Sequence, residues 1–490
     1  MLSPSWCFLH QDTEMSAKGN VTLKNFFIFN ATYGPKEGEE EKKIMYYYPK
    51  NVDIDTKIKQ IGLCEAIVQF TGTFSDQPCE SLHTQKHRQI LLEPEKNFWI
   101  TMTVTVPFTE KTRDGQVYVE YHEEDVQDSV MEAVLKQAYR MFTLFNGSFY
   151  HILNNSNGDV FVLQQRLDHF YSRYLLTLRL QQSDILDIYN GIYFLPLDKN
   201  TFLQVQCFIN ILEASFPAIK YTAFLYSDLL VWSGLEQDDM RIMYRYLITS
   251  LFPSYSEQEL QAGGSQPSPA RTISVPGNSG IHFGKFITGP PNMKDETNLG
   301  KIPRVYINTE VDNEDCHLLV YRALNATVCL LLNSSITLNF ELCKKLDAFL
   351  GPKLSALASE VGEQYSKRPQ NRLQCCEMFS VEQQYKYIYF NHMNLAQKTT
   401  VHADLRKSVG VGLPQDILRV LSDVSTDLTK NNRDGETIVR TLSDCWVVGK
   451  KSDQREVLIV LNQKNSNLVE ITEEVKRLCS TNFSNIFFLE

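Results

Sequence analysis

Short apolar runs alternate with polar breaks in KYTAFLYSDLLVWSGLEQDDMRIMYRYL, the stretch from Lys220 to Leu247. The runs Tyr221–Tyr226 and Leu229–Trp232 are rich in aromatic and apolar residues, and the polar pair Ser227-Asp228 between them predicts a β-hairpin. A helix is predicted next, because acidic residues mark its start and apolar residues then recur at helical spacing. That apolar stripe consists of Met240, Met243, Tyr244, Leu247 and Leu251.

A similar order of elements occurs near the beginning of the sequence. The strand-like runs Phe26–Asn30 and KIMYYYP come before a predicted helix at Ile54–Phe74. Three more strands are predicted at Arg88–Leu92, Phe98–Val106 and Val117–Tyr121. A closing helix then carries Val126, Val130, Val134, Met141 and Phe145 on one side. The order strand, strand, helix, strands, helix therefore occurs at least twice.

A third and fainter version lies at the end of the sequence. It starts with Tyr385–Asn394, continues with a predicted helix at Pro414–Leu428 and a hairpin in CWVVGKKSDQREVLIVLN, and ends with a helix at Leu468–Cys479. The three versions share a pattern without detectable sequence identity. They predict an α+β fold of three modules, each an antiparallel sheet flanked by helices.

Composition changes and joins suggest where these modules begin and end. We expect a flexible N-terminus at 1–22, a first module at 23–180, a second at 187–362 and a third at 384–490. The first module includes an extra amphipathic helix, and the second contains a loop at about 253–303 that is rich in Pro, Ser and Gly and is predicted to be mobile. The extra helix carries Leu163, Leu167, Phe170, Tyr174 and Leu178.

Charge and composition exclude several classes of protein. The chain of 490 residues has a formal net charge of −10 and a sequence pI of about 5.6, which argues against a nucleic-acid-binding protein. It has neither a convincing signal peptide nor an apolar run of the ~18 residues that a membrane span needs. The 11 cysteines contain no C-x-x-C pair, and we interpret them as reduced thiols of a cytosolic protein.

Motifs for catalysis or cofactor binding are missing from the sequence. GIHFGKF and the pair Gly449-Lys450 each lack part of the phosphate-loop pattern. His83 and His87 are four residues apart but have no carboxylate close by in the sequence, which favours a solvated pair over a metal site. No nucleophile elbow is present. We therefore predict no catalytic residue, no cofactor and no metal.

The predicted helix at Ile54–Phe74 has more apolar residues than one contact requires. Ile58, Ile61, Cys64 and Val68 share one face, while Leu63, Ile67 and Phe70 spread around the helix. The surplus predicts a second buried contact. Either another module or chain makes it, or the chain's own helices at Val126–Phe145 or Leu163–Leu180 cover it, and the sequence leaves both open.

Basic residues form three local clusters in the later modules. They are Lys344-Lys345, Lys450-Lys451 with Arg455, and Lys476-Arg477. Solvated helix faces or turns explain such clusters, and contact with anionic lipid is the alternative.

Several sequence segments resemble segments of the Ccz subunits of the Mon–Ccz vacuolar-fusion complexes. They are GLCEAIVQF, SLHTQK, KYTAFLY, WSGLEQDDMR, YFNHMNLAQK, WVVGKKSD and VLNQKN, and the resemblance covers Phe26 to Glu490. It implies three longin domains and an obligate heterodimer with a Mon subunit. The pair would act as a guanine nucleotide exchange factor for the late-endosomal Rab GTPase of the Rab-seven type, without hydrolytic chemistry of its own. The resemblance also implies a third regulatory subunit in animals and peripheral recruitment to late endosome and lysosome membranes.

In such a complex the first longin domains of both subunits hold the GTPase. We expect this chain's share of the interface on the Ile58–Phe70 helix and the Arg88–Leu92 strand. The expected contact residues are Ile58, Ile61, Leu63, Cys64, Ile67, Val68, Phe70, Ile90 and Leu92. Two alternatives remain, a tri-longin scaffold or effector tether and an exchange factor subunit for a Rab of lysosome-related organelles.

Overall fold

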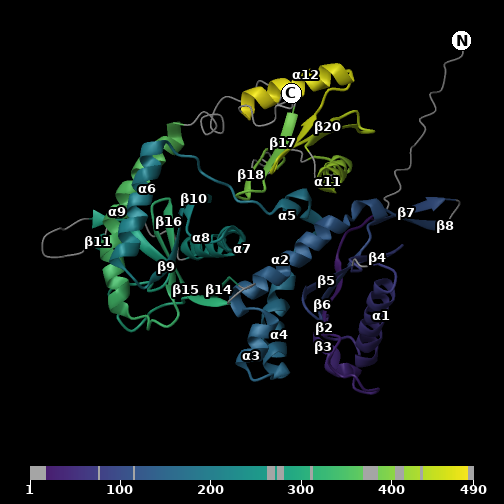
Figure 1. Cartoon of the computed structure of the whole chain (residues 1–490), viewed down its shortest axis with the longest axis horizontal. Helices are drawn as coiled ribbons and strands as arrows, with labels where there is room; N and C mark the ends of the chain where they lie inside the picture. The colour runs from purple at the N-terminus through teal and green to yellow at the C-terminus, as the bar shows by residue number, and fades with distance from the viewer. Residues whose placement is uncertain are drawn as a thin grey trace, which may run out of the picture. The chain divides into compact units, whose positions relative to one another are not determined.

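A computed structural model describes most of the chain. The described residues are 18–75, 78–113, 116–261, 271–272, 281–308, 313–367, 385–402, 413–430 and 434–483. They divide into two compact units, of which the first runs to Lys136 and resumes at Tyr171–Asp184, while the second comprises Gln137–Phe170 and the chain from Ile185 onwards. Antiparallel sheets flanked by helices form both units (Figure 1), which confirms the predicted α+β class.

The first unit is built around a five-stranded antiparallel sheet in the order β3-β2-β6-β5-β4. Its strands are β2 (Leu23–Asn30), β3 (Ile44–Tyr48), β4 (Ser81–Thr84), β5 (His87–Glu95) and β6 (Phe98–Thr105). Between β3 and β4 runs helix α1 (Ile54–Gly72), close to the predicted range. Asp53 caps α1 by accepting a hydrogen bond from the Thr56 amide, so the helix begins where its side chain can satisfy a free N–H.

The two faces of this sheet pack against different helices. Phe27, Phe29 and Leu91 form a core with Ile61 and Cys64 of α1. On the opposite face, the buried Tyr171 ring of α4 (Val160–Thr177) lies 4.8 Å from the Phe26 ring and 5.6 Å from the Tyr46 ring, centroid to centroid. Alternation of side chains along the strands explains why neighbours such as Phe26 and Phe27 serve different cores.

The predicted strand Val117–Tyr121 does not belong to this sheet. It forms β8 (Gln116–Tyr121), which pairs with β7 (Phe108–Arg113) and, beyond it, β1 (Lys18–Gly19) in a separate sheet. The main sheet instead gains β4, which the sequence reading missed because SLHT is short and polar. β1 falls within the stretch 1–22 that we expected to be flexible, and residues 1–17 lie outside the described ones.

The second module, in the second unit, contains a sheet of order β10-β9-β16-β15-β13 with β14 also paired to β15. Its strands are β9 (Ile219–Tyr226), β10 (Leu229–Ser233), β13 (Gly284–Thr288), β14 (Arg304–Ile307), β15 (Glu314–Ala323) and β16 (Ala326–Asn333). Helices α6 (Lys199–Ser215) and α9 (Phe340–Lys367) pack with these strands in one apolar core. The predicted hairpin and the helix after it are confirmed as β9, β10 and α7 (Gln237–Tyr246), which continues as a π-helical turn at Leu247–Leu251.

The predicted loop at 253–303 is wrong at its beginning and for one segment inside it. Helix α8 (Phe252–Gln261) lies there and follows the π-helical turn Leu247–Leu251 without a break, with Pro253 as its second residue. Inside the range, Gly284–Thr288 is the sheet strand β13, while 289–303 contains no helix or strand. A Cβ on Gly284 would lie 1.8 Å from the Tyr321 hydroxyl oxygen, so a glycine is needed at this position. The short strands β11 (Arg271–Thr272) and β12 (Ile281–His282) also lie here, and residues 262–270 and 273–280 fall outside the described ones.

The third module has a five-stranded sheet in the order β18-β17-β21-β20-β19. Its strands are β17 (Tyr385–Asn391), β18 (Ala396–Thr399), β19 (Gly435–Arg440), β20 (Trp446–Ser452) and β21 (Arg455–Leu461). Helices α11 (Gln415–Lys430) and α12 (Leu468–Asn482) confirm the two predicted ones and pack on separate apolar cores.

The structure also describes the helices α2 (Asp128–Asn146), α3 (Phe149–Asn155) and α5 (Ile185–Tyr189). Short 3₁₀ turns lie at Glu40–Lys43, between β2 and β3, and at Glu123–Asp125 and Leu180–Gln182. The predicted strand-like GIYFLPL forms isolated bridges, one from Ile192 to Ala396 and one from Phe194 to Leu230.

Candidate interaction surface

Helix α1 buries one face in the core of the first unit and exposes the opposite face to solvent. Ile61 and Cys64 are 2% and 1% exposed, and the Gln89 side-chain amide donates to the Cys64 sulfur at 3.1 Å. Burial raises the pKa of the Cys64 thiol to about 11, so this group stays protonated and behaves as an apolar core residue.

The outer face of α1 carries a second apolar stripe, formed by Leu63, Ile67, Phe70 and Phe74. These residues are spaced i, i+4, i+7 and i+11 along and just beyond the helix. Leu63, Phe70 and Phe74 are 59%, 65% and 77% exposed, and the Phe70 and Phe74 rings meet edge to face with centroids 5.0 Å apart. Within the described residues, these three side chains of the outer stripe are therefore left uncovered. A contiguous exposed apolar surface of this kind is typical of a protein–protein contact.

Only part of the predicted contact set lies on this surface. Ile61, Cys64 and Ile90 are buried in the chain's own core, so the prediction that they contact a partner is wrong. Ile58, Ile67, Val68 and Leu92 are partly buried. Since Leu91 faces α1, the alternation of a strand directs Ile90 and Leu92 to the opposite side of the sheet, and they share no surface with the outer stripe. Phe74 was missed, although its distance of four residues from Phe70 indicates the same face.

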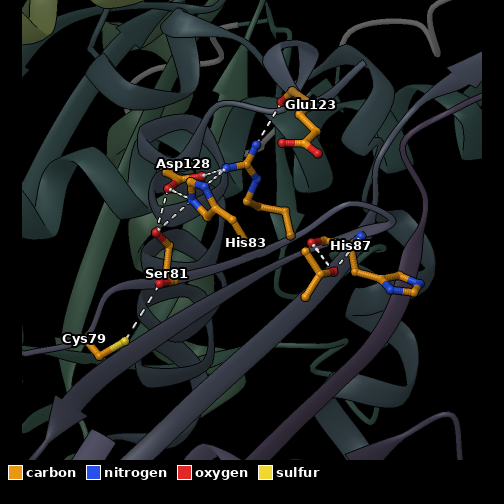
Figure 2. Close-up of polar contacts among 8 residues, drawn as sticks. Cys79, Ser81, His83, His87, Glu123 and Asp128 are labelled. Atoms are coloured by element: carbon orange, nitrogen blue, oxygen red, sulfur yellow. Dashed lines mark hydrogen bonds and ion pairs between the residues drawn. The ribbon is translucent and has the colours of Figure 1, made fainter. Parts of the chain in front are cut away.

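A polar cluster joins the edge of the first sheet to the beginning of α2 (Figure 2). The Ser81 hydroxyl and His83 Nε2 each lie 2.6 Å from Asp128 Oδ2. The buried Arg88 guanidinium faces His83 Nδ1, lies 3.4 Å from Asp128 Oδ1 and donates to the Glu123 carbonyl at 2.8 Å. His83 is exposed to solvent, as expected, but the expectation that it has no carboxylate close by is wrong. The neighbouring carboxylate was invisible in the sequence because it lies 45 residues further on.

The Ser81–His83–Asp128 group is not arranged for nucleophilic catalysis. In a catalytic triad the two histidine nitrogens face different partners, the nucleophile and the carboxylate. Here Nε2 faces both Ser81 and Asp128, while Nδ1 must accept from the guanidinium of Arg88, which can only donate. The serine hydroxyl donates to the carboxylate, so no base is in position to activate it. The cluster acts structurally by tying β4 and β5 to α2.

We expect Asp128→Ala to lower the unfolding free energy of the first unit by about 1–3 kcal/mol, because the buried Arg88 loses its carboxylate and Ser81 and His83 lose their acceptor. Glu132→Ala is the matched control on the same helix. It removes only a surface pair with Lys136 and should cost about 0.3–0.5 kcal/mol. Urea titration of both variants measures the difference, and equal midpoints would contradict the structural role of the cluster.

The predicted lipid-facing residues do not form one basic surface. Lys450 is 5% exposed and lies 3.3 Å from Glu436, so the prediction that it faces lipid is wrong. Lys451 donates to the Leu428 carbonyl at 3.3 Å. Lys344 lies 2.6 Å from Glu296 and Arg477 lies 2.5 Å from Glu474, so both cations are paired with carboxylates. Lys345 and Lys476 are exposed, but they lie on α9 and α12 of different modules.

The glycine–lysine pairs that resemble phosphate loops lie inside strands. Gly284-Lys285 is in β13 and Gly449-Lys450 in β20, where backbone N–H groups pair with neighbouring strands. A Cβ on Gly449 would come within 2.5 Å of the Val424 side chain, so this glycine serves the packing of α11. In the part of the chain that the structure describes, no group of three His, Cys, Asp or Glu residues could hold a metal ion. None of the described helices combines the length and apolar character of a bilayer crossing.

Comparison with known sequences finds three longin families along the chain. The first is described as the first longin domain of INTU, CCZ1 and HPS4 and matches residues 23–147. Intu longin-like domain 2 matches 219–351, and Intu longin-like domain 3 matches 381–478. These matches agree with the three modules of the fold.

Full-length relatives are similar over nearly the whole chain. A vacuolar fusion protein CCZ1 homolog of Nematostella vectensis is 53% identical over 471 residues, which are 96% of this chain and 98% of the relative. The Xenopus laevis homolog is 50% identical over 473 residues, with the same shares of both chains. The Dictyostelium discoideum homolog is still 30% identical over 476 residues, covering 95% of this chain and 98% of its own.

Proposed function

The chain belongs to the family of CCZ1 vacuolar fusion proteins, and on this premise we propose that it is one subunit of a heterodimeric guanine nucleotide exchange factor that acts in vacuole and lysosome fusion. Its partner is a Mon subunit, and its substrate is the late-endosomal Rab GTPase of the Rab-seven type. The pair serves endosome maturation and autophagy. Near full-length similarity to CCZ1 homologs from distant organisms carries this proposal.

The outer stripe of α1 is this chain's contribution to the shared docking face. Three exposed apolar side chains on one helix face have a large surface to bury and no cover within the described chain. Burying them against a partner longin or the GTPase is favourable by about 25 cal/mol for each Å² of apolar surface. This stripe replaces the set proposed from sequence, because Ile61, Cys64 and Ile90 already pack inside the chain.

Exchange of this kind needs no bond-making group. A factor that binds the nucleotide-free GTPase better than the nucleotide-bound form weakens nucleotide binding, and by linkage the nucleotide weakens the factor's binding equally. A ~10³-fold acceleration of release requires lowering the barrier by about 4 kcal/mol. Differential contacts across one interface supply that amount. The polar cluster around Asp128 supports such a role by fixing the edge of the sheet rather than by reacting.

Recruitment to membranes is a further part of the proposal. We expect peripheral contact with late endosomes and lysosomes, and a third regulatory subunit in animals. With Lys344, Lys450 and Arg477 paired to carboxylates, the contribution of this chain to anionic lipid binding is reduced to separate residues such as Lys345 and Lys476. Most of the membrane affinity would then come from the other subunits.

The test is release of a fluorescent GDP analogue from a panel of Rab GTPases. The chain alone, the Mon subunit alone and the copurified pair are compared. We expect acceleration of about 10³-fold by the pair on the late-endosomal Rab and none by this chain alone. Full activity of the isolated chain would overturn the shared-face mechanism. Preference for the GTP-bound over the nucleotide-free GTPase would instead identify an effector tether, and activity on a Rab of lysosome-related organelles would change the substrate.

A further inference from the structure

Residues 185–195, here called the strap, lie between the second and third modules and contact both. The strap begins with α5, whose Ile185 and Tyr189 are 1% and 4% exposed and belong to the apolar core of the third module. The Tyr189 ring lies 4.8 Å from the Phe390 ring of β17. The third module's core therefore includes residues from outside its own sheet and helices.

The backbone after α5 pairs with a strand of each module. Ile192 donates its N–H to the Leu395 carbonyl and accepts from the Gln397 N–H, both at 2.8 Å, next to β18. Tyr193 accepts from the Leu230 N–H, and Leu195 donates to the Leu230 carbonyl, both also at 2.8 Å, along β10. Because successive residues of an extended chain direct their backbone groups to opposite sides, one short segment serves as an edge strand for two sheets.

A buried polar network fastens the strap to the third module. The Tyr189 hydroxyl donates to Glu456 Oε1 at 2.6 Å and lies 2.9 Å from the Ser425 hydroxyl, and Glu456 is 2% exposed. His392 Nε2 lies 3.4 Å from the other carboxylate oxygen. Burial, together with the nearby Glu456, raises the pKa of Tyr189 well above its ordinary value, so the phenol keeps the proton that it donates. A hydrogen bond to a buried carboxylate is among the stronger kinds in proteins.

A second anchor holds the strap to the second module. Arg245 of α7 lies 3.0 Å from Asp187 Oδ1 and donates to Asn190 Oδ1 at 3.4 Å. Gly191 follows directly and packs so closely that a Cβ there would lie 2.4 Å from the Gln397 Cβ. The two anchors thus lie within the four residues 187–190, so neither can move far while the other is intact.

We propose that the strap couples the second and third modules into one cooperative unit, so that breaking either anchor lowers the local stability of both modules. If the two modules were independent domains joined by a linker, a change at Glu456 would alter the local stability of the third module only. With the strap as a shared edge strand, opening at Tyr189 frees Ile192 from β18 and also removes the restraint that holds Tyr193 and Leu195 on β10.

Hydrogen exchange of the full chain, purified with its partner subunit if they copurify, tests this coupling. Tyr189→Phe removes the donor and keeps the shape of the ring. We expect amide exchange to rise about 10- to 100-fold in β17 and β18, and to rise in β10 and α7 of the second module as well. Phe194→Leu is the matched control, because Phe194 is 36% exposed and an apolar replacement leaves the backbone pairing of the strap in place, so exchange should stay nearly unchanged.

The reciprocal variant acts from the other side. Arg245→Gln breaks the second-module anchor and should raise exchange in β18 of the third module, because coupling between two sites is mutual. An increase confined to the module that carries the altered anchor, in either variant, would overturn the proposal. Should Tyr189→Phe fail to fold, Ser425→Ala weakens the same hydrogen-bond network more mildly, and amide exchange is measured in the same strands and helix.

Discussion

Placing aspartate at both Leu63 and Phe70 is expected to abolish binding of the partner subunit or the GTPase while leaving the chain folded. Both side chains are more than half exposed, so a carboxylate there keeps its hydration in the free protein. In a complex the same carboxylates would be buried without partners. Central apolar contacts cost about 2 kcal/mol or more when lost, so the two changes together lower the affinity about a thousandfold.

Titration calorimetry against the Mon subunit and nucleotide release by the reconstituted pair measure this effect. Leu176→Asp is the matched control, since Leu176 is 73% exposed on α4 in the same unit but away from the α1 stripe. We expect the control to bind and to exchange as the unaltered chain does. If the double variant kept its affinity and its exchange activity with an unchanged thermal midpoint, the outer stripe would not be the docking surface.

Tyr171→Ala is expected to give the largest loss of stability in the first unit, about 3–5 kcal/mol. Tyr171 is fully buried, and its ring packs between Phe26 and Tyr46 on the side of the sheet away from α1. Removing the ring leaves a cavity that the rigid sheet cannot close, and that cavity adds to the lost transfer free energy.

Urea denaturation followed by tyrosine and tryptophan fluorescence measures the loss. The nearby Leu176→Ala on the same helix changes an exposed side chain and should stay within about 0.5 kcal/mol of the unaltered chain. Tyr171→Phe should recover most of the difference, because the ring contacts remain. A Tyr171→Ala midpoint equal to that of Leu176→Ala would show that α4 does not complete this core.

Periodicity in the sequence predicted the elements that have long apolar stripes. The hairpin β9–β10, the helix α1 and the helices α11 and α12 all have buried residues at regular spacing, and all were placed within a few residues. β4 was missed because a strand of four mostly polar residues shows no hydrophobic periodicity. β8 was placed in the wrong sheet because the sequence of a strand does not identify the strand with which it pairs. Helix α6 was missed although Val205, Ile209 and Leu212 are spaced as one buried face.

The site was harder to predict than the fold for a physical reason. The sequence indicates that α1 has apolar residues in excess, but burial decides which of them are available, and burial depends on packing with β2, β5 and β6. Cys64 and Leu63 are adjacent in sequence, yet one is 1% and the other 59% exposed. The Asp128 cluster depends on a contact across 45 residues, which no local pattern contains.

The strap also constrains how this chain can be cut, lengthened or recombined. Backbone groups of Ile192 point to β18, and those of Tyr193 and Leu195 point to β10. Even and odd positions of the strap therefore pair with different sheets, whatever the length of the segment. Inserting one residue before Ile192 would turn the backbone groups that now pair with β18 toward β10, and the reverse. Inserting two residues would keep each group facing its present sheet. Chimeras between relatives of this family should therefore place their junctions outside 185–195, and a linker chosen for length alone would misalign both neighbours.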